Sequence, residues 1–85
     1  MKNIGSVTNK WLENAGIDTV EELRQIGVVP VYCLIKKMES SVSLNLLWGL
    51  EGAAENIDYR EITERRKDEL KLELETFIQN NPEWQ

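Results

Sequence analysis

The amino-acid sequence predicts an all-α protein, a compact bundle of about five short helices. Apolar residues recur three or four positions apart along most of the chain, and this spacing places them on one face of a helix. Alternation of apolar and polar residues, which is typical of half-buried strands, is scarce. Residues that favour helix N-caps precede several apolar stretches. We expect residues 1–85 to form a single domain with a frayed tail over 80–85.

The first two predicted helices form a tight hairpin. The first begins with Ser6 as its N-cap, runs to Ala15, and ends at Gly16, which suits a left-handed C-terminal position. The second begins at Thr19, whose spacing from Glu22 is that of a capping box, and ends at Gly27. The expected inner faces are Val7, Trp11, Leu12 and Ala15 in the first helix, and Val20, Leu23 and Ile26 in the second.

The third and fourth predicted helices carry most of the remaining core. The third starts around Pro30, since proline suits a first helical turn, and its apolar residues are Val31, Leu34, Ile35 and Met38. The fourth starts at about Ser43 and is apolar nearly all round, which predicts a central, buried helix. Gly49 and Gly52 lie inside it, and each costs about 1 kcal/mol of helix propensity relative to alanine. We expect a neighbouring helix to approach closely there.

The fifth predicted helix closes the bundle. It begins at Thr63 and runs to about Gln79, with an inner face of Leu70, Leu74, Phe77 and Ile78 and a charged outer face. In the bridge before it, over 56–62, Tyr59 is expected to pack down as an anchor. Trp84 in the tail is expected either to dock or to fray with its neighbours.

The composition argues against an enzyme. The chain has no histidine, which removes the most common general base and metal ligand, and it has one cysteine, Cys33, among apolar positions of the third helix. A buried, inert thiol is expected there. No phosphate-binding or dinucleotide-binding loop is present, so no cofactor or metal is expected. No apolar stretch is long enough for a membrane span, and a single thiol suits a reducing compartment, so we expect a cytoplasmic location.

The charge distribution restricts where nucleic acid could bind. The net charge is −5; residues 1–50 balance five basic against five acidic side chains, whereas residues 51–85 hold five basic and ten acidic ones. A phosphate contact would therefore need a local patch. The best candidate is the glycine-bearing turn before the first helix, whose N–H groups, hydroxyls and lysines suit an anion: Lys2, Gly5, Ser6, Thr8 and Lys10. The simpler interpretation is that Gly5 permits a turn and Ser6 caps a helix.

Several segments together resemble a known family. They are Asn3-Ile4-Gly5, Trp11-Leu12, Ala15-Gly16-Ile17, Thr19 to Leu23, Gly27-Val28, Tyr32, Leu34 to Lys36, and above all the signature Ser43-Leu44-Asn45-Leu46-Leu47-Trp48-Gly49-Leu50-Glu51-Gly52-Ala53. Over about residues 2–75 the chain is similar to the C-terminal domain of TfoX/Sxy proteins, bacterial regulators of natural competence. The resemblance implies a compact helical fold with helix-hairpin-helix or SAM-like character in its N-terminal part, no cofactor and no catalytic residues. Full-length members carry a further N-terminal domain. The resemblance covers the C-terminal domain alone, so we expect a stand-alone copy of that domain.

The signature residues also have a structural interpretation. Leu46, Leu47 and Leu50 are expected in the core, and Glu51 is expected to cap or pair locally. Asn45, if it is buried, needs hydrogen-bond partners, which the ends of neighbouring helices could supply. The other members of the signature set are Ser43, Trp48 and Gly52.

Three hypotheses of function follow. The first is a non-enzymatic interaction module in competence-type or transcriptional regulation, which acts on a protein partner and turns its acidic C-terminal third to solvent or to a basic surface. The second is weak, sequence-independent binding of the DNA backbone through the turn at Gly5. The third is self-association, as a homodimer, through Trp48 or Trp84 on an exposed apolar patch.

Overall fold

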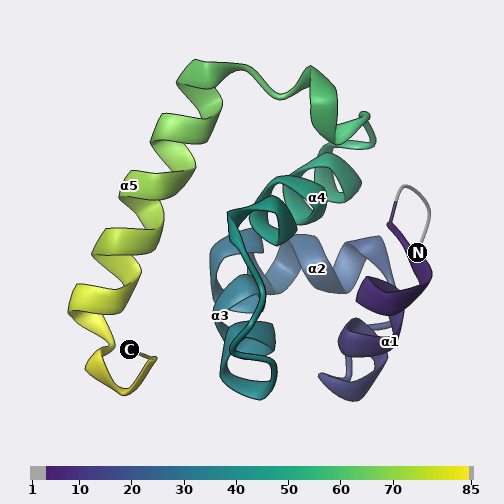
Figure 1. The fold of residues 1–85 in the computed structure, drawn as a ribbon, viewed down its shortest axis with the longest axis horizontal. Coiled ribbons are helices and arrows are strands. Elements are labelled where there is room, and N and C mark those ends of the chain that lie inside the picture. Colours follow the sequence, from purple (N-terminus) through teal and green to yellow (C-terminus); the bar gives the residue numbers. More distant parts are fainter. Residues whose placement is uncertain (1–3, 85) are drawn as a thin grey trace.

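The computed structural model describes residues 4–84, which fold into five α-helices and two short 3-10 helices (Figure 1). The α-helices are α1 (Ser6–Asn14), α2 (Val20–Ile26), α3 (Val28–Met38), α4 (Leu44–Glu55) and α5 (Glu64–Asn80); the 3-10 helices are η1 (Tyr59–Glu61) and η2 (Pro82–Trp84). No strand occurs in this range, so the prediction of an all-α fold with about five helices is confirmed. None of the helices within 4–84 has both the length and the apolar character of a membrane span.

The start of α1 differs from the prediction. Gly5 is the N-cap, with extended backbone and no side chain capping the helix, so Ser6 is the first helical residue instead. Val7 was expected on the inner face, but it is 62% exposed. Its position explains this, because Val7 lies five residues before the buried Leu12 and therefore about 140° from it around the helix. Trp11 packs partly buried against the core, as expected.

The link between α1 and α2 follows the predicted local chemistry. Gly16 has a positive φ of 81°, and the Ile17 N–H donates to the Leu12 carbonyl oxygen at 2.9 Å. The Thr19 hydroxyl accepts from the Glu22 N–H at 3.1 Å, and the Glu22 carboxylate accepts from the Thr19 N–H at 3.1 Å. The capping box is therefore confirmed. The helix-hairpin-helix or SAM-like character of this part stays a prediction.

A single residue, Gly27, separates α2 from α3. Its φ of 104° turns the chain, and α3 begins directly after it at Val28. Pro30 thus lies within the first turn of α3 and does not begin it, which is still compatible with its missing N–H. Ile26 and Met38, expected on buried stripes, are 45% and 50% exposed. Each is the last residue of its helix, where few neighbouring side chains surround it.

The central helix of the core is α4. It packs against α2 and α3, and the Arg24 Nε donates to the Ala54 carbonyl oxygen at 2.7 Å. The hypothesis that Trp48 lies on an exposed patch is wrong, because Trp48 is only 8% exposed. The buried residues of α4 are Leu46, Leu47, Trp48, Leu50, Glu51, Gly52, Ala53 and Ala54.

The turn after α4 folds back over Gly52. Asn56 is left-handed, with φ of 57°, and the Ile57 N–H donates to the Gly52 carbonyl oxygen at 2.9 Å. A Cβ atom on Gly52 would lie 2.9 Å from the Ile57 carbonyl oxygen and 3.2 Å from the Tyr59 Cα. The close approach expected at Gly52 is therefore present, and it is made by the turn at Ile57 and by Tyr59, the first residue of the short 3-10 helix η1. Tyr59 does not pack down as an anchor but is 52% exposed, because its backbone fills the space above Gly52.

The last helix, α5, packs against α3 and begins as predicted. The Thr63 hydroxyl accepts from the Arg66 N–H at 3.1 Å, and Leu70 is buried. Leu74, Phe77 and Ile78 pack partly buried against the core. Within the segment predicted to fray, η2 contacts α3, and the Lys37 Nζ donates to the Glu83 carbonyl oxygen at 3.3 Å. The Trp84 side chain and Gln85 lie outside the described part of the chain.

Candidate interaction groove

The residues predicted to contact phosphate divide between two sides of α1. Ser6 and Lys10 are exposed and four positions apart, so they share one side of the helix. Thr8 is half-buried and lies about 200° from each of them. Gly5 precedes the helix, and Lys2 is outside the described residues. The fold thus separates the Lys10 ammonium from the hydroxyl of Thr8.

The family-signature residues divide between the core and the surface. Leu46, Leu47 and Leu50 are in the core as predicted. Ser43 caps α4, since its hydroxyl accepts from the Asn45 N–H at 3.3 Å. Asn45 is exposed, so it does not need the buried partners that a core position would have required.

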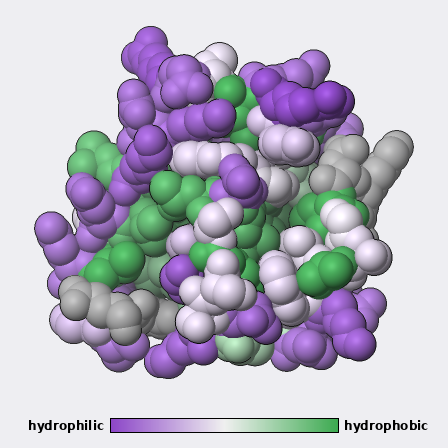
Figure 2. All heavy atoms as spheres, viewed as in Figure 1, coloured by the Kyte–Doolittle hydropathy of each residue, from purple (hydrophilic) through white to green (hydrophobic). Residues whose placement is uncertain are grey.

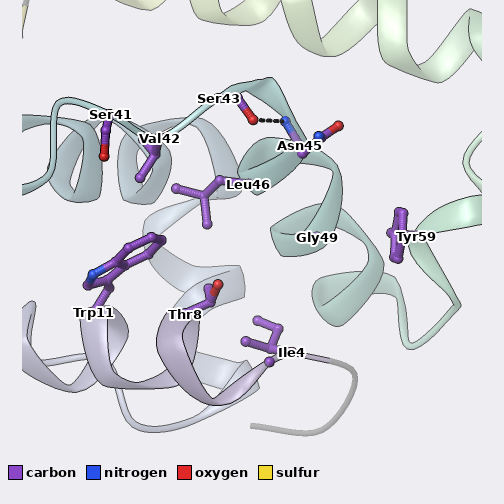
Figure 3. A pocket seen from close by; sticks show the side chains of 11 residues that line it. Ile4, Thr8, Trp11, Ser41, Val42, Ser43, Asn45, Leu46, Gly49 and Tyr59 are labelled. Carbon is purple, nitrogen blue, oxygen red and sulfur yellow. Dashed lines mark hydrogen bonds between the residues drawn. The ribbon is translucent and has the colours of Figure 1, made fainter.

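A groove of about 560 Å³ joins the start of α1 to the start of α4 (Figure 3). It is bounded by α1 on one side and by α4 with its leading segment on the other, and Trp11 and Tyr59 stand at opposite ends of the view. Gly5 and Thr8 from the predicted phosphate contact meet Ser43, Asn45 and Leu46 from the signature here. The described residues that line the groove are Ile4, Gly5, Thr8, Trp11, Ser41, Val42, Ser43, Asn45, Leu46, Gly49 and Tyr59.

The lining that residues 4–84 give the groove is uncharged. None of its lining residues is acidic or basic, although 29% of the residues in the chain are charged. In Figure 2 hydrophilic side chains gather towards the edges of the view, while apolar and near-neutral ones occupy its middle. The first turns of α1 and α4, which open here, hold no acidic residue, so the partial positive charge of their N–H groups is not neutralised within them. The groove combines apolar surface, neutral hydrogen-bonding groups and a weak positive potential.

Six lining residues of the groove were not predicted as site residues: Ile4, Trp11, Ser41, Val42, Gly49 and Tyr59. A Cβ atom on Gly49 would meet nothing within 4 Å, so this glycine is not required by packing inside the molecule. Its place in the middle of a helix, where glycine is unfavourable, was the signal in the sequence. Tyr59 gave no such signal, because its exposure depends on how the chain turns after α4.

Comparison with protein-family models identifies the family of this chain. A model described as the TfoX C-terminal domain matches residues 1–74. The chain belongs to the TfoX C-terminal domain family. The predicted resemblance is confirmed, and every lining residue of the groove in this TfoX C-terminal domain lies within the matched range. No curated protein and no solved structure matched it significantly.

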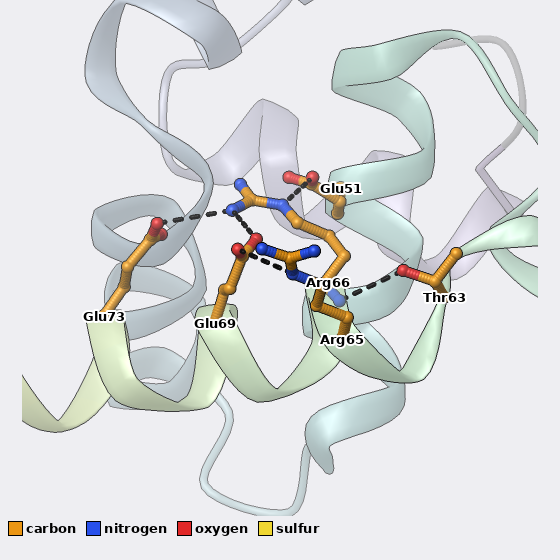
Figure 4. Close-up of polar contacts among 6 residues, drawn as sticks. All are labelled: Glu51, Thr63, Arg65, Arg66, Glu69 and Glu73. Atoms are coloured by element: carbon orange, nitrogen blue, oxygen red, sulfur yellow. Dashed lines mark hydrogen bonds and ion pairs between the residues drawn. The ribbon is translucent and has the colours of Figure 1, made fainter.

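A partly buried ion pair joins α5 to α4 in this TfoX C-terminal domain (Figure 4). The Arg66 Nε lies 2.7 Å from a carboxylate oxygen of Glu51, which is 4% exposed, and Arg66 also reaches Glu69 and Glu73 at 3.3 and 3.4 Å. Hydrogen bonding to Glu51 raises the pKa of the Arg66 guanidinium. Glu51 was expected to pair locally, but its partner comes from the next α-helix. The cluster is structural, because its one deeply buried carboxylate is already paired.

The aromatic ring of Trp48 is covered by the same helix. The Nζ atoms of Lys67 and Lys71 lie 5.5 and 6.0 Å from its centroid, within the range of cation–π attraction. These contacts explain how a large ring at the edge of α4 is hidden from water. They also engage two basic side chains of the C-terminal third, the partly buried Lys67 and the exposed Lys71.

Three further observations within residues 4–84 concern the thiol, the residue types that bind metals and an exposed ion pair. Cys33 is buried, and burial raises the pKa of its thiol, which makes it a poor nucleophile. No group of three histidine, cysteine or acidic residues in this range could hold a metal ion. The Arg60 guanidinium, 2.7 Å from Asp58, lowers the pKa of that exposed carboxyl to about 2 and forms a local ion pair.

Proposed function

We propose that this domain is a non-enzymatic protein-interaction module and that the groove between α1 and α4 receives the partner. The observation that carries the proposal is a groove of about 560 Å³ whose lining, in the described part of the chain, has no charged residue and has aromatic side chains towards both ends. Tyrosine and tryptophan are enriched at protein interfaces, and charged residues are depleted from their centres. Membership of the TfoX family supports a role in competence-type regulation.

The charge pattern favours a protein partner over the DNA backbone. Binding to phosphates depends on lysines and arginines that release counterions, whereas the groove lining within residues 4–84 has none and the chain carries a net charge of −5. Lys10 lies on the other side of α1 from Thr8, so it does not add charge to the groove. Within residues 4–84, a DNA contact at this groove would rely on backbone amides and on neutral side chains such as Thr8, Ser43 and Asn45.

Site-specific photocrosslinking in cells of the source organism tests the proposal. A benzoylphenylalanine replaces Tyr59 in the groove or, as a matched control, Leu72, an exposed apolar residue on the outward face of α5. We expect a discrete protein adduct from position 59 that position 72 does not give. The additional substitution Asn45→Arg should abolish this adduct without unfolding the domain, because Asn45 is exposed.

Titration of labelled duplex DNA at low and moderate salt provides the opposing test. The proposal predicts little binding, and no difference between the wild type and Lys10→Glu. Tight, salt-sensitive duplex binding that Lys10→Glu weakens, together with no protein adduct at position 59, would contradict the proposal and favour the DNA hypothesis.

A further inference from the structure

The mid-helix glycine Gly49 has no explanation inside the molecule. Glycine in a helix interior costs about 0.5–1 kcal/mol relative to alanine, mainly through backbone entropy. At Gly52 this cost is explained, since the following turn leaves no room for a Cβ atom. At Gly49 a Cβ atom would meet open space, and this space is the groove. A missing side chain at the edge of an open groove lets another backbone approach α4 closely.

We propose that an amphipathic α-helix of another protein packs into the groove and crosses α4 at Gly49. This inference rests on the proposed function and specifies the partner. Small residues at a crossing point allow two helices to approach, and apolar side chains of the incoming helix, spaced three or four residues apart, would lie between Trp11 and Tyr59. Neutral lining residues such as Thr8 and Asn45 can hydrogen-bond to its polar edge.

Charge complementarity specifies the partner further. Two helix N-termini, those of α1 and α4, open at the groove, and neither first turn contains an acidic residue. By contrast, α2 has Glu21 and Glu22 in its first turn, and α5 has Glu64. An aspartate or glutamate on the incoming helix would therefore find uncompensated partial positive charge, whereas a basic helix would not. The partner helix is apolar on one face and acidic at its edge.

A second copy of this chain does not meet these requirements. A two-fold dimer pairs a surface with itself, and two concave grooves cannot fill each other. The most accessible helix of another copy, α5, exposes one large apolar residue on its outward face, Leu72, among charged neighbours. It lacks the row of apolar side chains that a groove-binding helix needs.

Selection from a displayed peptide library tests the proposal. The probe is a library of helix-stabilised peptides of about 16 residues, selected against the wild-type domain, with a matched library of extended peptides. We expect helical binders with apolar residues at i, i+3 or i+4, and i+7, and with an acidic residue beside that face. Gly49→Ala should weaken them about tenfold or more, and Gly49→Leu should weaken them further, whereas Leu72→Ala should have no effect.

The substitutions that weaken the selected peptides distinguish a failure of this inference from a failure of the proposed function. The Gly49→Ala domain should remain folded, because the added methyl group clashes with nothing in the molecule. Binders that respond to Asn45→Arg but tolerate Gly49→Leu would leave the groove as the binding site and overturn the crossing at Gly49. Recovery of extended or basic binders in place of acidic helices would also overturn it. Binders that are insensitive to both substitutions would contradict both proposals.

Discussion

Two glycines three residues apart in α4 should respond oppositely to the same substitution. At Gly49 an added methyl group meets nothing within 4 Å, so Gly49→Ala recovers the helix propensity of alanine and should stabilise the domain by about 0.5–1 kcal/mol. At Gly52 the methyl group would lie 2.9 Å from the Ile57 carbonyl oxygen and 3.2 Å from the Tyr59 Cα. Both are backbone atoms that a side-chain rotation cannot move. Overpacking costs about 1–3 kcal/mol, so after the propensity gain Gly52→Ala should destabilise the domain by about 0.5–2 kcal/mol.

Urea unfolding followed by circular dichroism at 222 nm measures both changes. A domain of this size has an m-value of about 1 kcal/mol/M in urea, so the midpoint should rise by about 0.5–1 M for Gly49→Ala. It should fall by about 0.5–2 M for Gly52→Ala, with an unchanged slope. A Gly52→Ala midpoint equal to that of Gly49→Ala would refute the packing argument for both positions.

Three further predictions concern the ion pairs and the thiol. Arg66→Met leaves the Glu51 carboxylate buried without its partner. Breaking a fully buried pair costs about 3–5 kcal/mol, but the Arg66 side chain is 37% exposed, so we expect the free energy of unfolding in urea to fall by about 1–3 kcal/mol. The decrease should be larger than for Glu51→Gln. A loss below about 0.5 kcal/mol would mean that the pair is not essential to the docking of α5. In carbon-detected NMR the pKa of the Asp58 carboxyl should be about 2, and it should move towards 3.8 in Arg60→Gln. Because the folded pKa is lowered, the stabilising contribution of Asp58 is present above about pH 3.8 and is lost as the pH falls through about 2. A wild-type pKa at the ordinary value would contradict the ion pair with Arg60. Cys33 should resist Ellman's reagent in the folded domain and react in urea, and immediate reaction without denaturant would contradict its burial.

Local chemistry is the part of the fold that the sequence predicts best. The capping box at Thr19 and Glu22, the caps at Ser43 and Thr63, and the left-handed Gly16 all depend on residues within a few positions of each other. Their hydrogen bonds form wherever the helix lies in the molecule. The helix count and the order of the elements follow from them and from the apolar spacing.

Exposure at the ends of helices was predicted less well. Ile26 and Met38 have the right residue type for a core stripe, yet their burial depends on whether another element covers that end of the helix. Tyr59 was expected to pack down as an anchor, but the turn after α4 brings its backbone, not its ring, against Gly52. Such outcomes are set by tertiary contacts that no local pattern encodes.

The candidate groove was predicted in pieces but not as a whole. Gly5 and Thr8 were selected for their hydroxyl and N–H groups, and Ser43 and Asn45 for the family signature, without any expectation that they would meet. Helix periodicity alone separates Thr8 from Lys10, which removes charge from the predicted phosphate site. The meeting of the two sets depends on how α1 packs beside α4, which is a property of the folded chain.

Intermolecular NOEs to the isotope-labelled domain, bound to a selected acidic helical peptide, test the central claim most directly. Docking in the groove predicts NOEs from both Gly49 Hα protons and from the Trp11 and Tyr59 rings to apolar side chains of the peptide. NOEs confined to the outward face of α5 around Leu72, with none to Gly49, would contradict it.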